Sequence, residues 1–585
     1  MQKCTEIEEL DGRDTRAMFE IVREITGEKR AFRGQIVTDR SGNILTAMED
    51  VSRRWKEYVE ELFDDQRGER PVLEGELEGP EILEDEVKLA LREMKREKAE
   101  GSDGVVSEML EAAGEFGIRK LTRLANRIYD SGDVPEKMRE SVLIALPKKP
   151  GAVQCEKHRT ICLASQIGKV ILRVIRKRMN GKIEERLDEK QYGFRKGKGT
   201  RNAIFILRMI IERSLEMQKD VYLCYIDFAK AFDRVKHEDM MEMLGEIGID
   251  GKDKRMIMNL YWNQKATVQI GEEQTEWVEI KRGVRQGCVL SPDLFNLYSQ
   301  KMIEELDELE GIRVGGVNVN NIRYADDTVL IADTQEKLQE LVSALERACE
   351  ARGMEINVGP GKTEVMGLTK RNEDLRVRIT LGGRSVPQVE RYKYLGCVIA
   401  KDGRSESEVV TRIGMAKSSF GKVKKVLTNM ELDWGIRLRL LKCYVWSVLL
   451  YGSETGTLDR KLKKRLDAAE MWFLRRMLRV PWTARMSNER VLERAGVGRQ
   501  LLGVVRTRQL RFLGHVLRGN ELEKEVLLGR IEGRRGRGRP RMRYTTSLLE
   551  DVPGNRRFVD LVEMARDRRE WRSMVAHVDQ DMAHR

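Results

Sequence analysis

Two kinds of hydrophobic pattern alternate along the first part of the chain. Residues 1–100 place apolar side chains at helical spacing, which predicts helices. Short, continuous apolar runs at 141–146 and 221–228 instead predict buried strands. Two further runs, at 322–323 and 328–332, flank a polar turn and predict a hairpin. These segments together favour a mixture of helices and short strands.

Amphipathic helical periods separate these strands and continue behind them. Four segments have that period, at residues 168–179, 200–217, 292–309 and 335–352. After Gly403 one helical pattern follows another, interrupted by a run rich in glycine, arginine and proline at 533–543. The chain has no internal repeat of fixed period. We therefore predict an α+β fold in the middle of the chain and a helical region behind it.

Composition narrows the class of protein before any motif is considered. The 585 residues are 41% hydrophobic and 35% charged, as in a folded chain of several domains. The longest apolar stretch, 443–451, is far shorter than the roughly 20 residues of a membrane span. Eight cysteines lack a CxxC spacing, which argues against zinc knuckles and disulfide frameworks. We expect a soluble intracellular protein with no membrane partner.

Charge is distributed unevenly between the two ends of the chain. Residues 401–585 contain 41 Lys and Arg against 23 Asp and Glu, a net charge of +18, whereas residues 1–400 have a net charge of −6. For any single run of charge, a solvated helix face is the commoner explanation. The total excess, however, favours a polyanionic partner such as nucleic acid for the C-terminal third.

Carboxylates stand at the ends of two of the predicted strands. Asp227 ends the apolar run that begins at Val221, and Asp326 and Asp327 occupy the turn of the predicted hairpin. Like charges brought together in this way need cations, and two Mg²⁺ ions roughly 3.5–4 Å apart would also suit phosphoryl transfer. Taken alone, Asp326-Asp327 has the alternative explanation of a hydrophilic turn.

These carboxylates lie in motifs that resemble the reverse transcriptases of non-LTR (LINE-type) retrotransposons. One short motif would be weak evidence, but six or more in the family's order and spacing are specific, and they cover most of the chain. The matching segments are KAEGSDG at 98–104, PKK at 147–149, HRTICL at 158–163, QYGFR at 191–195, YIDFAKAFD at 225–233, RQGCVLSP at 285–292, YADD at 324–327, Asn357 with KTE at 362–364, and YKYLGC at 392–397.

The resemblance implies a right-hand polymerase with fingers, palm and thumb, acting as an RNA-directed DNA polymerase. Asp227, Asp326 and Asp327 would form the metal-binding triad, with the first two as the more direct ligands of two Mg²⁺ ions, for which Mn²⁺ is a possible substitute. The primer 3′-hydroxyl would attack the α-phosphate of a deoxynucleotide, and pyrophosphate would leave.

Further residues match the family's nucleotide-binding positions. Lys362 would lie near the leaving pyrophosphate as a general acid, although the segment from Asn357 is about two residues longer than usual, and a surface lysine is the alternative. Phe232 matches the bulky steric gate that excludes a 2′-hydroxyl. A core phenylalanine is the alternative explanation of Phe232, and the two roles are compatible.

Two basic residues and one dipeptide match positions around the incoming nucleotide. Lys148 and Arg159 would hold the triphosphate, with solvated surface charges as the alternative. Gln286 and Gly287 would shape the pocket for nucleotide and template, because glycine lets the backbone approach closely. Asp233 is expected to order the start of a helix after the strand rather than to bind metal.

Nucleic-acid contacts are expected from the later motifs. Tyr392, Leu395 and Gly396 belong to a hairpin that would grip the primer end. Arg537 and Arg539 lie in the short core of a minor-groove AT-hook, for which a non-specific phosphate-binding arm or a nuclear targeting signal is the commoner alternative. A packed core histidine is the default for His515.

The resemblance and the charge pattern suggest five regions. They are an acidic helical N-terminal extension at 1–97, fingers and the start of the palm at 98–220, the palm at 221–400, a helical thumb at 401–482, and a basic nucleic-acid-binding region at 483–585.

No endonuclease pattern is evident in this sequence. Nothing before Gly101 has the strand-rich pattern of an apurinic-type nuclease, and no cysteine follows Cys443 that could build a zinc-knuckle arrangement. The chain therefore looks like the polymerase and C-terminal part of a longer element product, with the endonuclease expected from a missing domain or in trans. Expected partners are an RNA template, a DNA primer or target, and deoxynucleotides, with the nucleus as the site of action.

Two other functions remain open at this stage. A domesticated or decayed copy would bind nucleic acid without catalysis, although every catalytic residue that the resemblance requires is present. An RNA-dependent RNA polymerase would share the palm carboxylates, but Phe232 and the sequence YADD at 324–327 disfavour it.

Overall fold

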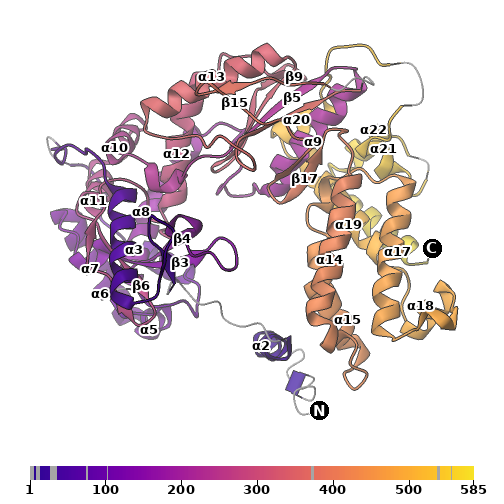
Figure 1. Cartoon of the computed structure of the whole chain (residues 1–585), viewed down its shortest axis with the longest axis horizontal. Coiled ribbons are helices and arrows are strands. Elements are labelled where there is room, and N and C mark those ends of the chain that lie inside the picture. The colour runs from indigo at the N-terminus through magenta and orange to yellow at the C-terminus, as the bar shows by residue number, and fades with distance from the viewer. Residues whose placement is uncertain are drawn as a thin grey trace.

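The computed structural model describes residues 6–7, 14–26, 36–73, 77–101, 103–370, 375–536, 540–554 and 556–584. Figure 1 shows the elements as an arch, with finger elements such as α3 and β3 at one side, the palm strands above, and the helices α14 and α17 at the other side. Within these described ranges, the molecule has no helix that is both long and apolar enough to cross a membrane.

The N-terminal extension and the fingers combine helices with a sheet. Their elements are α2 (Thr15–Thr26), β1 (Val37–Thr38), β2 (Ile44–Leu45), α3 (Met48–Phe63), α4 (Glu84–Arg92), α5 (Ser107–Ala112), α6 (Gly114–Ser131), α7 (Glu136–Arg139), β3 (Glu140–Pro147), β4 (His158–Leu163) and α8 (Gln166–Arg186). The first hundred residues contain the predicted helices, and in addition β1 and β2 pair as a short antiparallel ribbon before α3.

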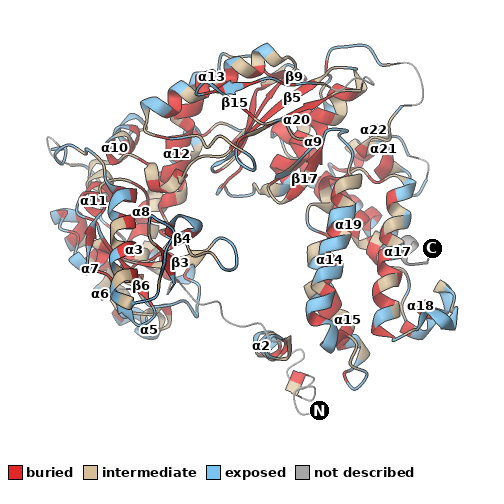
Figure 2. Ribbon diagram, viewed as in Figure 1, coloured by how far each residue is buried: buried red, intermediate tan, exposed pale blue. Residues whose placement is uncertain are grey.

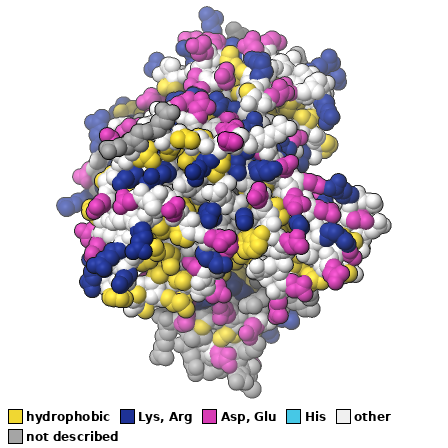
Figure 3. Space-filling view, turned by 90° about the vertical axis from the view of Figure 1, so that its left-hand side faces the viewer, with side chains coloured by type: hydrophobic (Ala, Val, Ile, Leu, Met, Phe, Trp, Pro, Cys, Tyr) yellow, Lys and Arg dark blue, Asp and Glu magenta, His cyan; other side chains and the backbone are white. Residues whose placement is uncertain are grey.

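The finger sheet has the strand order β4-β3-β6-β7, with β6 spanning Lys265–Ile270, β7 Glu273–Gln274, and β8 (Val278–Glu279) also paired to β6. The predicted strand at 141–146 is β3, which lies antiparallel to β4 and parallel to β6. Helix α3 covers this sheet through a core that includes Trp55 and Phe63. Figure 3 shows basic and acidic side chains interspersed over the finger side of the molecule.

The palm follows, with several helices around short strands. Its elements are α9 (Thr200–Glu216), β5 (Val221–Ile226), α10 (His237–Glu246), α11 (Gly251–Trp262), α12 (Ser291–Ile303), β9 (Ile312–Val314), β10 (Val317–Val319), β11 (Asn321–Tyr324), β12 (Asp327–Ala332), α13 (Gln335–Ala351), β13 (Glu364–Leu368), β14 (Thr380–Leu381), β15 (Arg384–Ser385), β16 (Arg391–Tyr394) and β17 (Cys397–Ala400).

The central palm sheet is antiparallel, in the order β11-β12-β5-β13. Strand β5 is apolar at successive positions because both of its faces are buried. Leu223 and Tyr225 belong to the core shared with α9, whereas Cys224 and Ile226 belong to the core shared with α12 and α13. Figure 2 shows these strands as buried, so the catalytic motifs are carried on a sheet enclosed on both faces.

Helices make up the thumb and the C-terminal region. They are α14 (Glu406–Leu427), α15 (Trp434–Leu440), a π-helical turn (Leu441–Trp446), α16 (Ser447–Leu449), α17 (Arg460–Met477), α18 (Asn488–Ala495), α19 (Leu501–Arg518), α20 (Leu522–Leu528), α21 (Tyr544–Leu549), α22 (Phe558–Met564) and α23 (Arg568–His584). Helices α14 and α17 pack through Phe420 and Phe473, and α2 joins them where Phe19 meets Tyr444 edge to face at 5.3 Å.

The helices after residue 500 pack on the palm. The ring of Phe205 in α9 lies edge to face against Phe512 of α19, with 5.2 Å between centroids, and against Tyr544 of α21 at 5.4 Å. Leu513 and Val575 share one buried core with strand β5. The palm sheet therefore takes part of its hydrophobic cover from the far end of the chain.

The predicted α+β fold is confirmed, since helices and several β-sheets alternate through the middle of the chain and helices follow behind. The strand at 221–228 is β5, the hairpin is β11–β12, and the predicted helix at 335–352 is α13. The helix expected at 292–309 ends early at Ile303, after which a 3₁₀ turn (Glu304–Leu306) continues the chain. The five domain boundaries stay a prediction.

Candidate active site

The three predicted catalytic carboxylates lie at one edge of the palm sheet. Strand β5 ends at Ile226, so Asp227 is the first residue beyond it, and Ile226 pairs with Thr328 of β12. Asp327 begins β12, and Asp326 lies in the turn between β11 and β12. The antiparallel register thereby brings the end of one strand beside the turn of the hairpin.

Buried polar groups hold that turn from below. Ala325 has a φ of 57°, in the left-handed region, and its N–H donates to Gln191 Oε1 at 3.0 Å. The same oxygen accepts from the Gly193 N–H at 2.9 Å. A Cβ on Gly193 would lie 2.2 Å from the Ala325 nitrogen, so only glycine permits this approach. Asn296 completes the support by donating to the Gly193 carbonyl at 2.9 Å.

Burial and mutual repulsion set the electrostatics of the hairpin carboxylates. Burial raises the pKa of Asp326, with the charge of Asp227 adding to it. Burial, then Asp326 and Asp227, raises the pKa of Asp327 to about 6. Arg159 opposes both shifts. The two hairpin acids therefore favour a nearby cation.

Asp227 is engaged by two side chains that follow α13. Asn357 Nδ2 donates to Asp227 Oδ2 at 2.6 Å, and Lys362 Nζ lies 3.2 Å from the same oxygen. Gly359 and Gly361, both with positive φ, form the longer loop that brings Lys362 to this position. The structure thus places Lys362 in the site despite its unusual spacing.

The donor atoms suit a hard divalent cation, because all three acids present carboxylate oxygens. No three His, Cys, Asp or Glu side chains in the described part of the chain converge as a ready-made metal site. Asp227 Oδ2 instead carries the two contacts from Asn357 and Lys362. Binding of an ion to Asp227 would therefore compete with the lysine for this oxygen.

Basic side chains of the fingers approach the same edge. Burial lowers the pKa of Lys148, and nearby Lys362 and Arg159 lower it further, while Asp233 and Asp227 oppose the shift. Arg159 in β4 pairs with Leu146 in β3, and Lys148 follows Leu146 closely along the chain. The two residues predicted to bind the triphosphate, Lys148 and Arg159, therefore lie at neighbouring strand ends. The structure brings Lys148, Arg159 and Lys362 together with the carboxylates.

Phe232 is fixed in an aromatic cluster. Its ring stacks on Phe295 of α12, with 4.4 Å between centroids and 14° between planes, and meets Phe194 edge to face at 6.2 Å. The side chain is only partly buried, at the margin of the palm core. This placement agrees with both roles considered for Phe232, packing and steric exclusion.

Asp233 has a different role from the one expected. It lies inside a 3₁₀ turn (Ala231–Arg234) whose first flanking residue is Lys230, so it does not start a helix. Its carboxylate is buried and accepts from Gln286 Nε2 at 2.9 Å. Burial raises the pKa of Asp233 to about 6, although the hydrogen bond from Gln286 lowers it.

Gln286 and Gly287 connect the palm to the fingers. The Gln286 carbonyl accepts from the Cys162 N–H at 2.7 Å. Gly287 has a φ of 111°, and a Cβ there would lie 3.0 Å from the Cys162 carbonyl oxygen. The glycine therefore permits close approach of strand β4, which carries Arg159.

The hairpin β16–β17, which contains Tyr392, is anchored to the catalytic strand by aromatic stacking. The Tyr392 ring lies parallel to that of Tyr225, two residues before Asp227, at 3.8 Å between centroids and 8° between planes. At its turn, Leu395 and Gly396 have φ values of 47° and 83°. The predicted primer-gripping residues are thus tied to the carboxylate edge.

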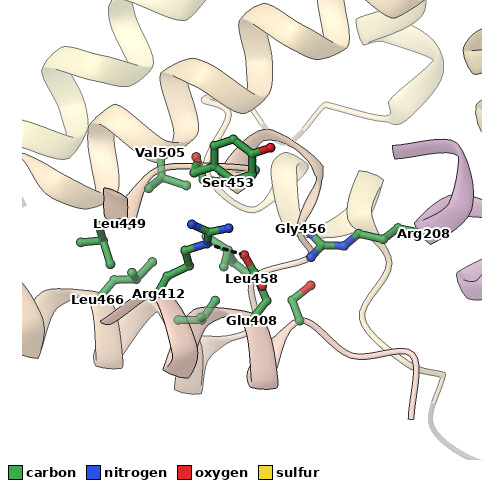
Figure 4. A pocket seen from close by; sticks show the side chains of 13 residues that line it. Arg208, Glu408, Arg412, Leu449, Ser453, Gly456, Leu458, Leu466 and Val505 are labelled. Carbon is green, nitrogen blue, oxygen red and sulfur yellow. Dashed lines mark hydrogen bonds and ion pairs between the residues drawn. The ribbon is translucent and has the colours of Figure 1, made fainter. Parts of the chain in front are cut away.

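The thumb contacts the turn of this hairpin directly. Tyr451 Oη donates to the Leu395 carbonyl at 2.7 Å, and Arg412 donates to the Gly396 carbonyl. Arg412 and Glu408 form an ion pair at 2.7 Å beside a cavity of about 40 Å³. Arg208 also points toward this cavity (Figure 4). Thumb and hairpin are therefore linked by polar contacts, one of them partly buried and one exposed.

Sequence reasoning missed the residues that support the site. In the sequence, Gln191 and Asn357 stand out only as parts of motifs, and the pattern does not predict their contacts with the turn and with Asp227. The only sequence feature that points to a supporting role for them is that they share motifs with Gly193 and Lys362. Arg537 and Arg539 lie outside the described residues.

Comparisons with known proteins agree with this geometry. The family model for reverse transcriptase (RNA-dependent DNA polymerase) matches residues 146–399. A transposon-derived protein of Caenorhabditis elegans is 30% identical over 280 residues, covering 45% of this chain and 98% of that protein. The Pol polyprotein from the type-1 retrotransposable element R2 of Nasonia vitripennis is 28% identical over 328 residues, covering 54% of this chain.

This chain spans 31% of that R2 polyprotein. A solved structure of apo telomerase from Candida tropicalis resembles the chain more distantly, at 13% identity and a TM-score of 0.35, over 71% of this chain and 73% of that chain. Its likeness adds nothing to the assignment.

The motifs, the carboxylate edge and the family match define a palm domain of the reverse transcriptase family. The chain belongs to the reverse transcriptases of non-LTR retrotransposons. Polymerases of this family generally use divalent metal ions.

Proposed function

We propose that this chain is an RNA-directed DNA polymerase that extends a DNA primer along an RNA template of a LINE-type mobile element. The observation that carries the proposal is the edge of the palm sheet. There Asp227 and the turn of Asp326 and Asp327 lie together, with basic side chains from the fingers and from the loop after α13 around them.

Asp227 and Asp326, with Asp327 beside them, would hold two Mg²⁺ ions, or Mn²⁺ in their place. Bound there, the metal would lower the pKa of the primer 3′-hydroxyl and neutralise charge on the transferring phosphate. The raised pKa values of Asp326 and Asp327, which come first from burial and then from neighbouring carboxylates, support this assignment, because a bound cation would favour the ionised form of both groups.

In the reaction, the primer 3′-oxygen forms a bond to the α-phosphorus, and the bond from that phosphorus to the bridging oxygen of pyrophosphate breaks. Lys148 and Arg159 would bind the triphosphate as cations. Lys362, which a bound ion would displace from Asp227, would protonate the leaving pyrophosphate at its bridging oxygen.

Selection of deoxynucleotides would depend on Phe232. Its ring is stacked on Phe295 and cannot turn away without breaking that contact. A rigid aromatic surface beneath the sugar would leave no room for a 2′-hydroxyl. The hairpin around Tyr392 would hold the primer end at a constant distance from the carboxylates, because Tyr392 stacks on Tyr225 of the catalytic strand.

The partners proposed are the element RNA as template, a DNA 3′-end as primer and target, and deoxynucleotides as substrates. An endonuclease that supplies the 3′-end would come from another part of the element product or in trans. The nucleus is the proposed site of action, since the chromosomal target lies there.

Primer extension tests this function. Wild-type chain and the Asp326→Asn/Asp327→Asn variant are given poly(rA)/oligo(dT), Mg²⁺ and either dTTP or UTP. We expect extension with dTTP, little with UTP, and loss of extension in the variant while duplex binding persists. No extension by a folded wild-type chain that still binds the duplex would contradict the enzyme and support the non-catalytic nucleic-acid-binding alternative.

A further inference from the structure

A basic pocket lies on the C-terminal helices, where the end of α19 meets the start of α23. It has a volume of about 370 Å³ and is lined by His515, Arg518, Gly519, Arg568, Trp571 and Arg572. None of the sequence motifs assigned to the polymerase falls in this pocket.

The pocket depends on one close helix contact. A Cβ on Gly514 would lie 2.2 Å from Trp571 Nε1, so glycine at this position lets the indole of α23 lie against α19. Trp571 Nε1 also donates to the Leu510 carbonyl at 3.1 Å, and the ring is buried. These contacts fix the first turn of α23 against the last turns of α19.

Three guanidinium groups share this space. Arg518 Nη1 donates to the Ala565 carbonyl at 3.0 Å, which directs the side chain along the pocket wall. Burial, followed by the nearby charges of Arg568 and Arg572, lowers the pKa of Arg518. In the part of the chain that the structure describes, no acidic side chain forms an ion pair with any of the three arginines.

Cations held together without an acidic partner favour an anion between them. Guanidinium groups bind phosphate oxygens in pairs and with fixed geometry, better than a point charge would. The expectation that His515 is a packed core histidine is wrong, because its side chain is exposed beside the arginines, where it offers a further ring donor. The surrounding residues 401–585 carry a net charge of +18, which would draw a long polyanion rather than a single small ion.

We propose that this pocket binds a backbone phosphate of a nucleic-acid strand outside the active site. The proposal rests on the polymerase function only in naming nucleic acid as the partner. Leu513 and Val575, from the same two helices, share a core with Leu223 of the catalytic strand. The pocket therefore sits at a fixed position relative to Asp227, and a strand held there would be anchored to the palm.

Direct binding tests the pocket without relying on catalysis. The full-length wild-type chain is compared with Arg568→Gln/Arg572→Gln, whose two side chains are exposed, so the fold should persist. The matched control is Arg566→Gln/Arg569→Gln, which removes the same charge from exposed positions outside the pocket. Fluorescence anisotropy measures binding of labelled single-stranded RNA and duplex DNA between about 50 and 200 mM salt.

We expect the pocket variant to bind about tenfold more weakly, with the slope of log affinity against log salt reduced by about 0.7–0.9, since the neutralisation of one phosphate is lost. The control should lie within about twofold of wild type. Arg568→Lys/Arg572→Lys should recover part of the affinity, because charge remains while the paired geometry is lost. Comparison of RNA with duplex DNA identifies which strand supplies the phosphate.

Equal affinity and slope in the pocket variant and the control would overturn the proposal. Protection of the wild-type chain against heat by inorganic phosphate, without any change in RNA or DNA binding, would also overturn it in favour of a small-anion site. Because these measurements use no deoxynucleotide, a chain that fails to extend primers can still support the pocket, and the two failures are distinguishable.

Discussion

Two hairpins meet at the carboxylate edge, and they are held in different ways. The turn of β11–β12, which carries Asp326, rests on directional hydrogen bonds from buried polar groups, chiefly Gln191. The turn of β16–β17 is held by the stacked rings of Tyr392 and Tyr225 and by contacts from the thumb. Both turns contain a non-glycine residue with positive φ.

The difference follows from what each hairpin carries. The catalytic turn holds adjacent acids whose repulsion would spread the loop, so its backbone is fixed by hydrogen bonds that specify position closely. The second hairpin carries no such charge at its turn, and ring packing with polar contacts at the tip suffices. Hydrogen bonds suit the β11–β12 turn, where the carboxylates need a position fixed to within about an ångström. Ring packing suits the β16–β17 hairpin, whose turn is in contact with the thumb.

The largest effect should come from charge at the catalytic turn. Asp326→Asn keeps the size of the side chain but removes the anion, and we expect the single-turnover rate of primer extension to fall about a thousandfold. Asp333→Asn, beyond the other end of β12, is the control, because its carboxylate pairs with Lys337 away from the turn. A fall of less than about tenfold would show that this carboxylate does not hold the metal.

The support beneath that turn is the next most sensitive position. Gly193→Ala would force the Ala325 backbone aside, since the added Cβ would lie 2.2 Å from its nitrogen. A shift of about 1 Å predicts a loss of roughly 100-fold in extension rate. Gly181→Ala provides the comparison, because no heavy atom lies within 4 Å of its added Cβ. An unchanged rate in Gly193→Ala would mean that the turn is held elsewhere.

Asp233 gives a reference carboxyl that lies in neither hairpin. Its pKa rises from an ordinary 3.8 to about 6 on folding, so the folded state binds the proton more tightly than the unfolded state. Below the unfolded pKa, the protonated carboxyl contributes its full stabilisation of the folded state. As pH rises through the folded pKa, ionisation of the carboxyl removes about 2–3 kcal/mol of the free energy of unfolding.

Chemical denaturation from pH 4 to pH 7 checks the sign for Asp233. Relative to Asp233→Asn, the free energy of unfolding of the wild type should decrease as pH increases across the window from 3.8 to about 6. A parallel pair of curves would show that Gln286 compensates fully for burial of the charge.

Ring stacking at the second hairpin should contribute less. Tyr392→Ala removes the contact with Tyr225, worth about 1 kcal/mol beyond burial, and we expect the KM for primer–template to rise roughly 3–10-fold with a small change in kcat. Tyr392→Phe keeps the ring and should resemble wild type. An equal effect of both substitutions would assign the role to the hydroxyl instead.

The smallest effect is expected at the tip of the same hairpin. Tyr451→Phe removes the hydrogen bond to the Leu395 carbonyl and the longer contact with Thr200 Oγ1 at 3.4 Å, both at exposed positions, with an expected cost of about 0.5–1 kcal/mol in stability. Thermal unfolding and the KM for primer–template measure it. If Tyr451→Phe raised the KM as much as Tyr392→Ala, the thumb rather than the palm would hold the hairpin.

Local pattern was enough to predict much of the palm. The apolar run of β5, the two arms around Asp326 and the amphipathic period of α13 each specify an element through neighbouring residues, and the acids follow from the ends of those elements. Lys362 was harder, because its position depends on two glycines that fold the extra residues into a loop.

Contacts between distant residues could not be predicted from the sequence alone. Gln191 accepts a hydrogen bond from Ala325, which lies 134 residues later in the chain, and the sequence around Gln191 does not indicate which residue it contacts. Helix α19 has an evident apolar face, yet its period does not indicate that Phe512 packs on Phe205. Asp233 was expected to start a helix because its local sequence suits one, whereas tertiary burial beside Gln286 decided its role.

The core shared by β5 and the C-terminal helices has a consequence for synthesis of the chain. Strand β5 and α9 emerge from the ribosome well before Phe512 and Val575, which cover one of their faces. Until those helices arrive, the nascent palm presents an uncovered apolar surface, and its sheet cannot reach its final packing. Helices made long after β5 therefore complete the packing of the strand that leads to Asp227, and a chain that stopped before them would leave an aggregation-prone palm.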